Sequence, residues 1–287
     1  MEIQYTLKHS LKVVRWQARR FETSLKWGAK ELSRMPIVLG NAMPKSGSHL
    51  IIQVLQGLTR LGPFVNPGFP PVNRTEDNRK LPDNDILDNL YNMRPGDIGY
   101  GYIGAQAKFV ETLTENNRAT IFVYRDPRDM IVSHIFYATQ MHKNHWMYTY
   151  YNEKLTSMEE RINAAILGVT EPGSELTPVR KRYDGYLGWL DEPSVLSLRF
   201  EQLILDRESA LEELLDYLEE KGFKPNTERQ SAIQVLSASI APGKSGTFRK
   251  GQPGNWREYF TTDNKKIFKE NTGDLLIRLG YESDASW

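Results

Sequence analysis

Apolar and polar positions along this chain follow two periods, which predicts strands that alternate with helices. Four short apolar runs, partly β-branched, are typical of buried strands and lie at 37–39, 98–103, 120–124 and 195–200. Hydrophobic positions at helical spacing come after these runs, at 50–58, 106–115 and 209–218. Strands that alternate with helices predict an α/β fold with three layers and a central, mostly parallel sheet.

The first 34 residues have a helical pattern of their own. One apolar stripe is formed by Leu7, Leu11, Val14, Ala18, Phe21, Leu25, Ala29 and Leu32. Eight cations and three acids give this segment a net charge of +5, against −4 for the rest of the chain. We expect 1–34 to be a basic amphipathic arm that packs its stripe on a single domain formed by 35–287, with the basic face in water. A helix that docks on a membrane surface or on a partner is the less favoured alternative.

Composition excludes several classes of protein. A formal charge of +1 over 287 residues argues against nucleic acid as a partner held by bulk electrostatics. The chain has no cysteine, so neither disulfides nor thiolate chemistry contribute. No apolar run reaches the length of a membrane span, and the first residues lack the apolar core of a signal peptide. We therefore expect a cytoplasmic protein; the sequence carries no signal for its oligomeric state.

The clearest chemical pattern lies between the first strand and its helix, in Pro44, Lys45, Ser46, Gly47 and Ser48. Glycine allows a close backbone approach, the serines supply hydroxyl donors, and the start of the helix presents unpaired N–H groups to an anion. The alternative is an ordinary turn capped by Ser48, with a lysine in solvent. The loop is not a Walker A motif, because its lysine precedes the glycine by two positions.

A second pattern follows the third predicted strand. Pro127 suits the first turn of a helix that Asp126 can cap, and Asp129 lies near its positive end. Arg125 ends the strand, and ligands of open α/β sheets bind beyond such ends, so Arg125 and the loop at Lys45 could face one crevice. In the alternative, Arg125 simply pairs with Asp126 or Asp129.

Three further segments carry weaker patterns. The loop 63–83 is rich in Pro, Asn and Gly, so we expect it at the surface, where it could cover the site. The aromatic segment 136–151 either lines an acceptor pocket or packs between helices, and its histidines have no spacing typical of a zinc site. The polar segment 169–181 predicts a connection or a mobile lid, and 248–256 places two adjacent cations in a Gly/Pro loop.

Taken together, these patterns resemble the cytosolic-type sulfotransferases, here of a bacterial kind, that use 3′-phosphoadenosine 5′-phosphosulfate (PAPS). The family's phosphosulfate loop, approximately P-K-S-G-T-T-W, is similar to Pro44-Lys-Ser-Gly-Ser-His-Leu50. Its R-D-P-R-D element, followed by V-S, matches Arg125–Asp129 and Val132-Ser133, and its R-K-G-x-x-G-D-W element matches 249–256. Three motifs in the right order make the resemblance specific, although it does not cover the arm.

The resemblance implies a role for individual residues. The 5′-phosphosulfate would be held by Lys45, Ser46, Gly47, Ser48 and His49. The 3′-phosphate would be held by Arg125, Ser133, Arg249, Lys250 and Gly251. Phe200 stands where the family usually has a tyrosine that stacks on adenine. The chain departs from the pattern at Leu50, Asn255 and Tyr102, which replace an aromatic residue, an aspartate and the usual catalytic histidine.

The implied reaction is an in-line transfer of the sulfuryl group from PAPS to a hydroxyl or amino group. The acceptor would be a small molecule such as a natural product, a sugar or a lipid head group, and no metal cofactor is implied. Lys45 would stabilise charge on the leaving oxygen. Candidates for the base are Tyr102, whose ordinary pKa of about 10 is unfavourable, and His49, His134 and His142. Two alternatives are a nucleotide kinase-like phosphotransferase and a non-catalytic module that binds adenosine bisphosphate.

Overall fold

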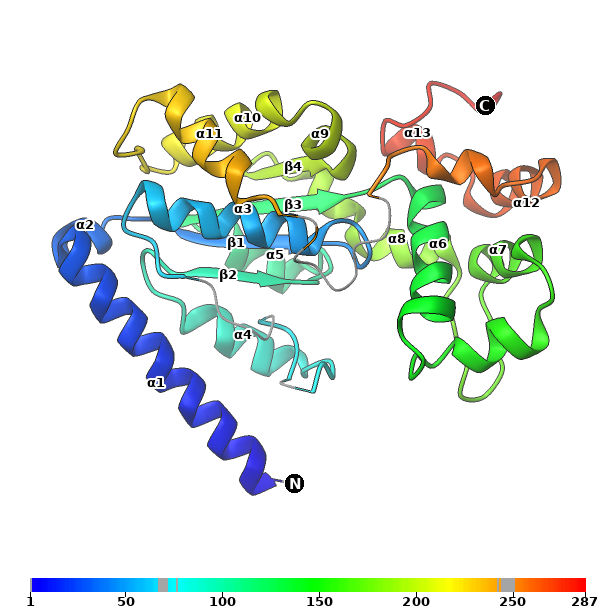
Figure 1. Cartoon of the computed structure of the whole chain (residues 1–287), viewed down its shortest axis with the longest axis horizontal. Coiled ribbons are helices and arrows are strands. Elements are labelled where there is room, and N and C mark those ends of the chain that lie inside the picture. The colour runs from blue at the N-terminus through cyan, green and yellow to red at the C-terminus, as the bar shows by residue number, and fades with distance from the viewer. Residues whose placement is uncertain (1, 67–71, 76, 242, 244–250) are drawn as a thin grey trace. The chain divides into compact units, whose positions relative to one another are not determined.

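The computed structural model describes residues 2–66, 72–75, 77–241, 243 and 251–287, with side chains from residue 11 onward (Figure 1). The chain forms two compact units, each made of two stretches of sequence. Unit 1 comprises Met1–Tyr124 and Gly188–Lys244, and unit 2 comprises Arg125–Leu187 and Ser245–Trp287. Each unit is described below by itself.

A parallel sheet of four strands forms the centre of unit 1. The strands are β1 (Ile37–Ala42), β2 (Ile98–Gly101), β3 (Arg118–Tyr124) and β4 (Val195–Arg199). Their order is β2-β1-β3-β4, and every neighbouring pair is parallel. All six residues of β1 are buried, as expected for a strand covered on both faces. The four predicted strands and the predicted fold class are confirmed.

Helices pack on this sheet through a large apolar cluster on one face. The cluster joins Val38 of β1 and Ile121 of β3 to buried leucines of the helices. These helices are α3 (Ser48–Leu61), α9 (Phe200–Leu205), α10 (Arg207–Glu220) and α11 (Arg229–Ser239). The alternate strand residues Leu39 and Phe122 are also buried but do not belong to this cluster, because successive side chains of a strand point to opposite faces. Unit 1 also contains α4 (Asp83–Tyr91) and α5 (Ala107–Leu113), which contact each other.

The arm forms helix α1 (Glu2–Trp27), which leads into the short α2 (Ala29–Leu32). Its orientation differs from the prediction: Leu32 is buried, but Leu11, Val14, Phe21 and Leu25 are exposed. The face of α1 that contacts the rest of unit 1 instead carries Trp16 and Arg20. Their side chains donate hydrogen bonds to the carboxylate of Asp97. Each residue of an α-helix turns by about 100°, so the face of Trp16 and Arg20 lies opposite the stripe. A buried acid therefore determines which face is turned inward.

Two connecting segments are packed more closely than their composition indicates. The predicted surface loop 63–83 begins in the core, where Phe64 is buried against the ring of Phe223 at 4.9 Å between centroids. Residues 67–71 and 76 of this loop lie outside the described residues. In the segment 169–181, Val169 and Leu176 pair as an isolated antiparallel bridge, and both are buried, so this part is an anchored connection.

Unit 2 is helical. Its longer helices are α6 (Pro127–Phe136), α7 (Met158–Leu167), α8 (Val179–Leu187) and α12 (Thr262–Thr272), followed by the short α13 (Leu275–Arg278). The predicted start of α6 is confirmed: Pro127 is its first residue, and the carboxylate of Asp126 accepts the N–H of Arg128 at 2.8 Å. Two π-helical turns, Tyr137–Met141 and Tyr150–Lys154, lie in or directly after the aromatic segment. Within the described part of the chain, no helix is long and apolar enough to cross a membrane.

Candidate functional site

The loop between β1 and α3 has an unusual backbone. Lys45 has a φ of 67° and Gly47 a φ of 98°, so two residues of the loop adopt left-handed conformations. For lysine this conformation is strained, by about 1–2 kcal/mol. At Gly47 a side chain would also lack room, because a Cβ there would lie 2.6 Å from the ring of Phe200. The sequence thus fixes one loop shape, which holds the lysine beside the start of α3.

The hydroxyl of Ser46 is the polar group in this loop that most needs a ligand. Its Oγ is fully buried, and among the described residues it has no hydrogen-bond partner. Buried hydroxyl groups in native proteins nearly always have a partner, so such a group indicates a ligand or water. Helix α3 begins two residues later, and the first amides of a helix have no acceptor within it. A donor hydroxyl, a helix N-terminus and a lysine at one loop fit a tetrahedral anion such as a phosphate or a sulfate.

Tyr102 lies at this loop, at the end of β2. Its hydroxyl donates a hydrogen bond to Oγ of Ser48 at 3.0 Å. The buried amide of Asn73 accepts from the N–H of Tyr102 and donates to its carbonyl, at 3.1 and 2.7 Å. Asn41 of β1 makes the same pair of bonds with Ile103, both at 2.8 Å. The structure therefore brings Tyr102 to the predicted phosphosulfate loop and holds it there through two asparagines that sequence reasoning missed.

His49 is the exposed histidine of the first turn of α3. Partial desolvation lowers its pKa, and the positive charge of Lys45 lowers it further. At neutral pH the imidazole is therefore neutral, the form that can accept a proton or a hydrogen bond. The neighbouring Leu50, which replaces a family aromatic residue, is buried in the apolar cluster of unit 1.

Phe200 lies against the same loop. It is the first residue of α9, directly after β4, and its ring is buried. The ring edge approaches Gly47 so closely that only glycine fits there. Unit 1 thus holds seven of the predicted site residues at or beside one loop: Lys45, Ser46, Gly47, Ser48, His49, Tyr102 and Phe200.

In unit 2, Asp129 joins the second and third sequence motifs. Its carboxylate accepts the N–H of Gly254 at 2.7 Å and the N–H of Trp256 at 2.8 Å. Arg125 approaches the same carboxylate at 3.9 Å, too far for a hydrogen bond. Burial raises the pKa of Asp129, while Arg125 and the two N–H groups act in the opposite direction. Asp129 therefore fixes the Gly-Asn-Trp turn, a structural role that the motif alone does not reveal.

The other acid–base pair of this motif is also structural. The guanidinium of Arg128 donates to Asp126 at 2.7–3.1 Å and forms a second ion pair with Glu282. Its central carbon lies 4.0 Å from the ring centroid of Trp256 and 4.4 Å from that of Trp287. The pKa of Arg128 is raised because these hydrogen bonds to Asp126 and Glu282 outweigh the effect of burial. Of the charged residues in this motif, Arg125 is the one that we still consider for binding a ligand.

The rest of the predicted 3′-phosphate set is only partly described. Ser133 lies on α6 and is half-buried. Gly251 has a φ of 60°, which favours glycine. Arg249 and Lys250 lie outside the described residues.

His134 belongs to an aromatic cluster of unit 2. Its ring centroid lies 5.2 Å from that of His145 and 5.9 Å from that of Tyr151, and His145 stacks on Trp146 at 3.9 Å. His134 is buried among these rings. The aromatic segment thus packs its rings on one another, and in the described residues no group of three or more potential ligands could hold a metal.

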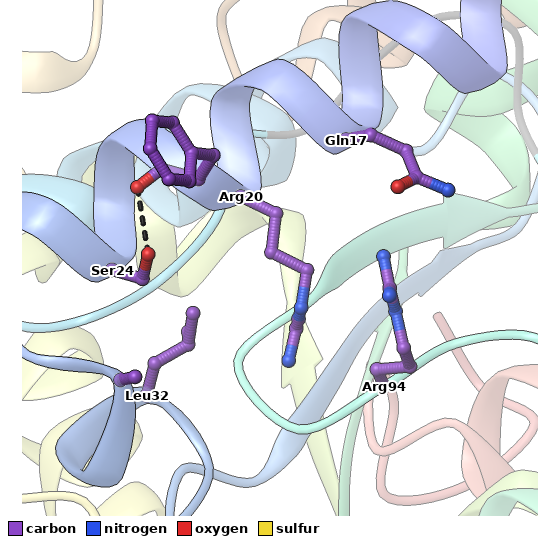
Figure 2. A pocket seen from close by; sticks show the side chains of 7 residues that line it. Gln17, Arg20, Ser24, Leu32 and Arg94 are labelled. Atoms are coloured by element: carbon purple, nitrogen blue, oxygen red, sulfur yellow. Dashed lines mark hydrogen bonds between the residues drawn. The ribbon is translucent and has the colours of Figure 1, made fainter.

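A pocket of unit 1 lies below α1, away from the motifs. It is lined by Gln17, Arg20, Phe21, Ser24, Ala29, Leu32 and Arg94. Figure 2 shows the guanidinium groups of Arg20 and Arg94 extending from opposite walls. None of the predicted site residues lines this pocket, so it is not the anion site of the loop.

Comparison with known proteins gives one consistent result. A family model described as "Sulfotransferase domain" matches residues 105–280. Human "Sulfotransferase 2A1" is 25% identical over 188 residues, which cover 58% of this chain and 61% of that protein. "Flavonol 3-sulfotransferase" of Flaveria bidentis is 25% identical over 53% of each chain. The match thus spans little more than half the length of these curated relatives.

Two solved structures share the fold. The mouse sulfotransferase SULT7A1 complexed with PAP has a TM-score of 0.57 at 15% identity, covering 89% of this chain and 93% of that one. Retinol dehydratase in complex with androsterone and inactive cofactor PAP has a TM-score of 0.52 at 17% identity, covering 86% and 83%. These two matches confirm the fold class.

Proposed function

The chain belongs to the sulfotransferase domain family, and from this membership we propose that it transfers the sulfuryl group of PAPS to a small-molecule acceptor. The family model covers more than half of the chain. The observation that carries the proposal is the loop of Lys45 to Ser48, with its strained backbone and the buried, unpartnered hydroxyl of Ser46 among the described residues. The loop fits the phosphosulfate end of PAPS, which supplies the sulfuryl group.

We assign Lys45 the central catalytic role. Transfer leaves negative charge on the oxygen that bridges sulfur and phosphorus, and a compact ammonium group at the loop would stabilise it. Only an interaction that strengthens in the transition state accelerates the reaction. Ser46, Gly47, Ser48 and His49 would hold the phosphosulfate through hydroxyl groups and backbone N–H groups.

The sequence motifs assign the 3′-phosphate of the nucleotide to a second set of residues. Arg125, Ser133 and Gly251 are proposed for the 3′-phosphate, together with Arg249 and Lys250 on the strength of the sequence motif alone. A guanidinium with a hydroxyl and a glycine turn offers the donors that a phosphate requires. Phe200, buried against the loop, is proposed to contact the adenine ring.

Tyr102 occupies the family's histidine position, and we propose that it positions Ser48. Its hydroxyl donates a hydrogen bond to Oγ of Ser48, which argues against a role as free base. His49 is neutral at neutral pH and lies on the loop, whereas His134 is enclosed by rings of unit 2. We therefore favour His49 over Tyr102 and His134 as the group that accepts the acceptor's proton.

The acceptor is proposed to be a small molecule with a hydroxyl group. The names of two similar proteins, a 3-alpha-hydroxysteroid sulfotransferase of Cavia porcellus and the flavonol sulfotransferase above, specify hydroxylated ring compounds. An amino group is the second choice, because the sulfuryl chemistry is the same for both nucleophiles.

Labelled PAPS tests the proposal directly. The purified protein is incubated with ³⁵S-PAPS and with phenols, sterols, flavonols, sugars or amines, and products are identified by mass. We expect transfer to at least one hydroxylated acceptor, and PAPS and PAP should compete for one site in calorimetry. ATP is the control nucleotide. Stabilisation by ATP alone would favour a kinase-like phosphotransferase, and PAPS binding without transfer to any acceptor would favour a non-catalytic module.

A further inference from the structure

The exposed side of α1 carries a continuous apolar stripe that unit 1 does not cover. Phe21 is 63% exposed, Leu25 71% and Val14 64%. Together with Leu11 and Ala18, these residues recur at intervals of three and four and so form one face of the helix. Scattered apolar residues are normal on a surface, but a row over four turns indicates a surface that binds something.

Contacts within the chain account for the attachment of α1 to the rest of unit 1, but not for the exposed apolar stripe. Trp16 and Arg20 attach α1 to Asp97, and Arg20 also donates to the carbonyl of Pro95 at 2.9 Å. Asp97 is buried, so this attachment is anchored in unit 1. With the opposite face attached, α1 can present its stripe without leaving unit 1.

The charges beside the stripe determine which occupant fits. A row of cations, Lys12, Arg15, Arg19 and Lys26, runs along one border of the stripe, and Arg15 and Lys26 are exposed. Residues 1–34 carry a net charge of +5. A second copy of α1 would carry the same positive charge, and the repulsion between like charges opposes pairing of the two helices. A surface with negative charge over an apolar interior satisfies both the cations and the stripe.

We propose that α1 binds the surface of an anionic membrane, with its axis in the plane of the bilayer. Leu11, Val14, Phe21 and Leu25 would enter the boundary between head groups and acyl chains, and the bordering cations would contact lipid phosphates and carboxylates. The charged residues of α1 exclude a spanning orientation, in agreement with the absence of a membrane-spanning helix among the described residues. This inference does not rest on the proposed sulfuryl transfer.

Vesicle sedimentation with the full chain tests the inference. Vesicles of pure phosphatidylcholine are compared with vesicles that also contain phosphatidylserine. We expect binding to the anionic vesicles that is at least about tenfold tighter and that weakens in high salt, because lipid charge attracts basic residues. Equal binding to both kinds of vesicle, or binding to neither, would overturn the proposal.

Two variants separate the stripe from the cations. The double variant Phe21→Ser with Leu25→Ser should reduce binding by about tenfold or more, since two large apolar side chains no longer enter the bilayer. The matched control, Leu167→Ser with Leu205→Ser, removes two exposed leucines of α7 and α9 and should bind as the parent does. Arg15→Glu with Lys26→Glu keeps the stripe and should remove the preference for anionic lipid. If the stripe variant binds normally, or if it instead abolishes a dimer seen without vesicles, the membrane is not the occupant.

Discussion

The loop at Lys45 and the motif at Arg125–Asp129 both bring charged and polar groups together, but these groups have different roles. In unit 2, Asp126, Arg128 and Asp129 accept or donate bonds within the protein. In unit 1, the buried hydroxyl of Ser46 has no partner among the described residues. Polar side chains therefore stabilise the fold in one place and are available to a ligand in the other. The two cases differ in whether the buried polar atoms have hydrogen-bond partners.

Replacement of Arg128 should produce the largest change. Arg128→Ala would leave the buried carboxylate of Asp126 without its guanidinium and open a space between Trp256 and Trp287. Loss of one partner of a buried ion pair costs about 3–5 kcal/mol of folding free energy. Denaturant unfolding followed by tryptophan fluorescence measures this loss. Arg34→Ala is the control, because Arg34 forms an exposed pair with Glu31, and it should cost at most about 0.5 kcal/mol. Equal losses for both variants would contradict a structural role of Arg128.

Replacement of Lys45 should change catalysis rather than folding. We expect Lys45→Ala to lower kcat by about 10²–10³-fold, the usual effect of losing one donor to a developing charge, with a much smaller effect on PAPS affinity. Stability should change little, because alanine keeps a Cβ and is as strained as lysine in the left-handed conformation. Arg at this position should rescue poorly, because a planar guanidinium does not replace a compact ammonium.

His49 supplies an independent readout for that variant. The charge of Lys45 contributes to the lowered pKa of His49, so Lys45→Ala should raise this pKa toward its ordinary value. The chain has five histidines, and NMR titration with a His49→Gln reference identifies the signal. If the Lys45→Ala protein turns over normally, or fails only because it no longer binds PAPS, Lys45 is not the catalytic cation.

A pair of serines gives the smallest and most selective test. Ser46→Ala should leave the stability of the free protein unchanged or slightly higher, because it removes a buried hydroxyl without a partner among the described residues. It should weaken PAPS binding by about 0.5–1.5 kcal/mol, the value of one hydrogen bond. Ser157→Ala is the matched control: Ser157 caps α7 by accepting the N–H of Glu160, so its loss should cost about 1 kcal/mol of stability and no affinity. If Ser46→Ala lowered stability and left the affinity for PAPS unchanged, the ligand would not bind at Ser46.

Local patterns in the sequence predicted the parts of the fold that local physics determines. The four strands, the helix after Gly47 and the cap at Asp126 each depend on neighbouring residues, and the structure confirms them. The direction of the stripe on α1 could not be predicted, because it depends on Asp97, which follows Trp16 and Arg20 by 81 and 77 residues. Helix α4 also gave no signal, since its polar sequence buries only Ile86 and Leu90.

The candidate site also has a part that could be predicted from local sequence and a part that could not. The loop of Lys45 to Ser48 could be identified from its residue types and their spacing. The asparagines that hold Tyr102 and Ile103 act across 29 and 62 residues, so no local pattern marks them. The structural use of Asp129 was also hidden, because its donors, Gly254 and Trp256, come from a distant turn.

The interleaving of the two units has a consequence for synthesis on the ribosome. Strand β3 ends at Tyr124, but its neighbour β4 begins at Val195, after the whole stretch Arg125–Leu187 of unit 2 has been made. Until then one edge of β3 stays open, and an open strand edge can pair with another chain. Unit 2 in turn is made of two stretches, and Trp287 of the second stretch covers Arg128 of the first. Neither unit can finish folding before synthesis of the other has begun, so we expect the open edge of β3 to be a place where nascent chains can associate wrongly.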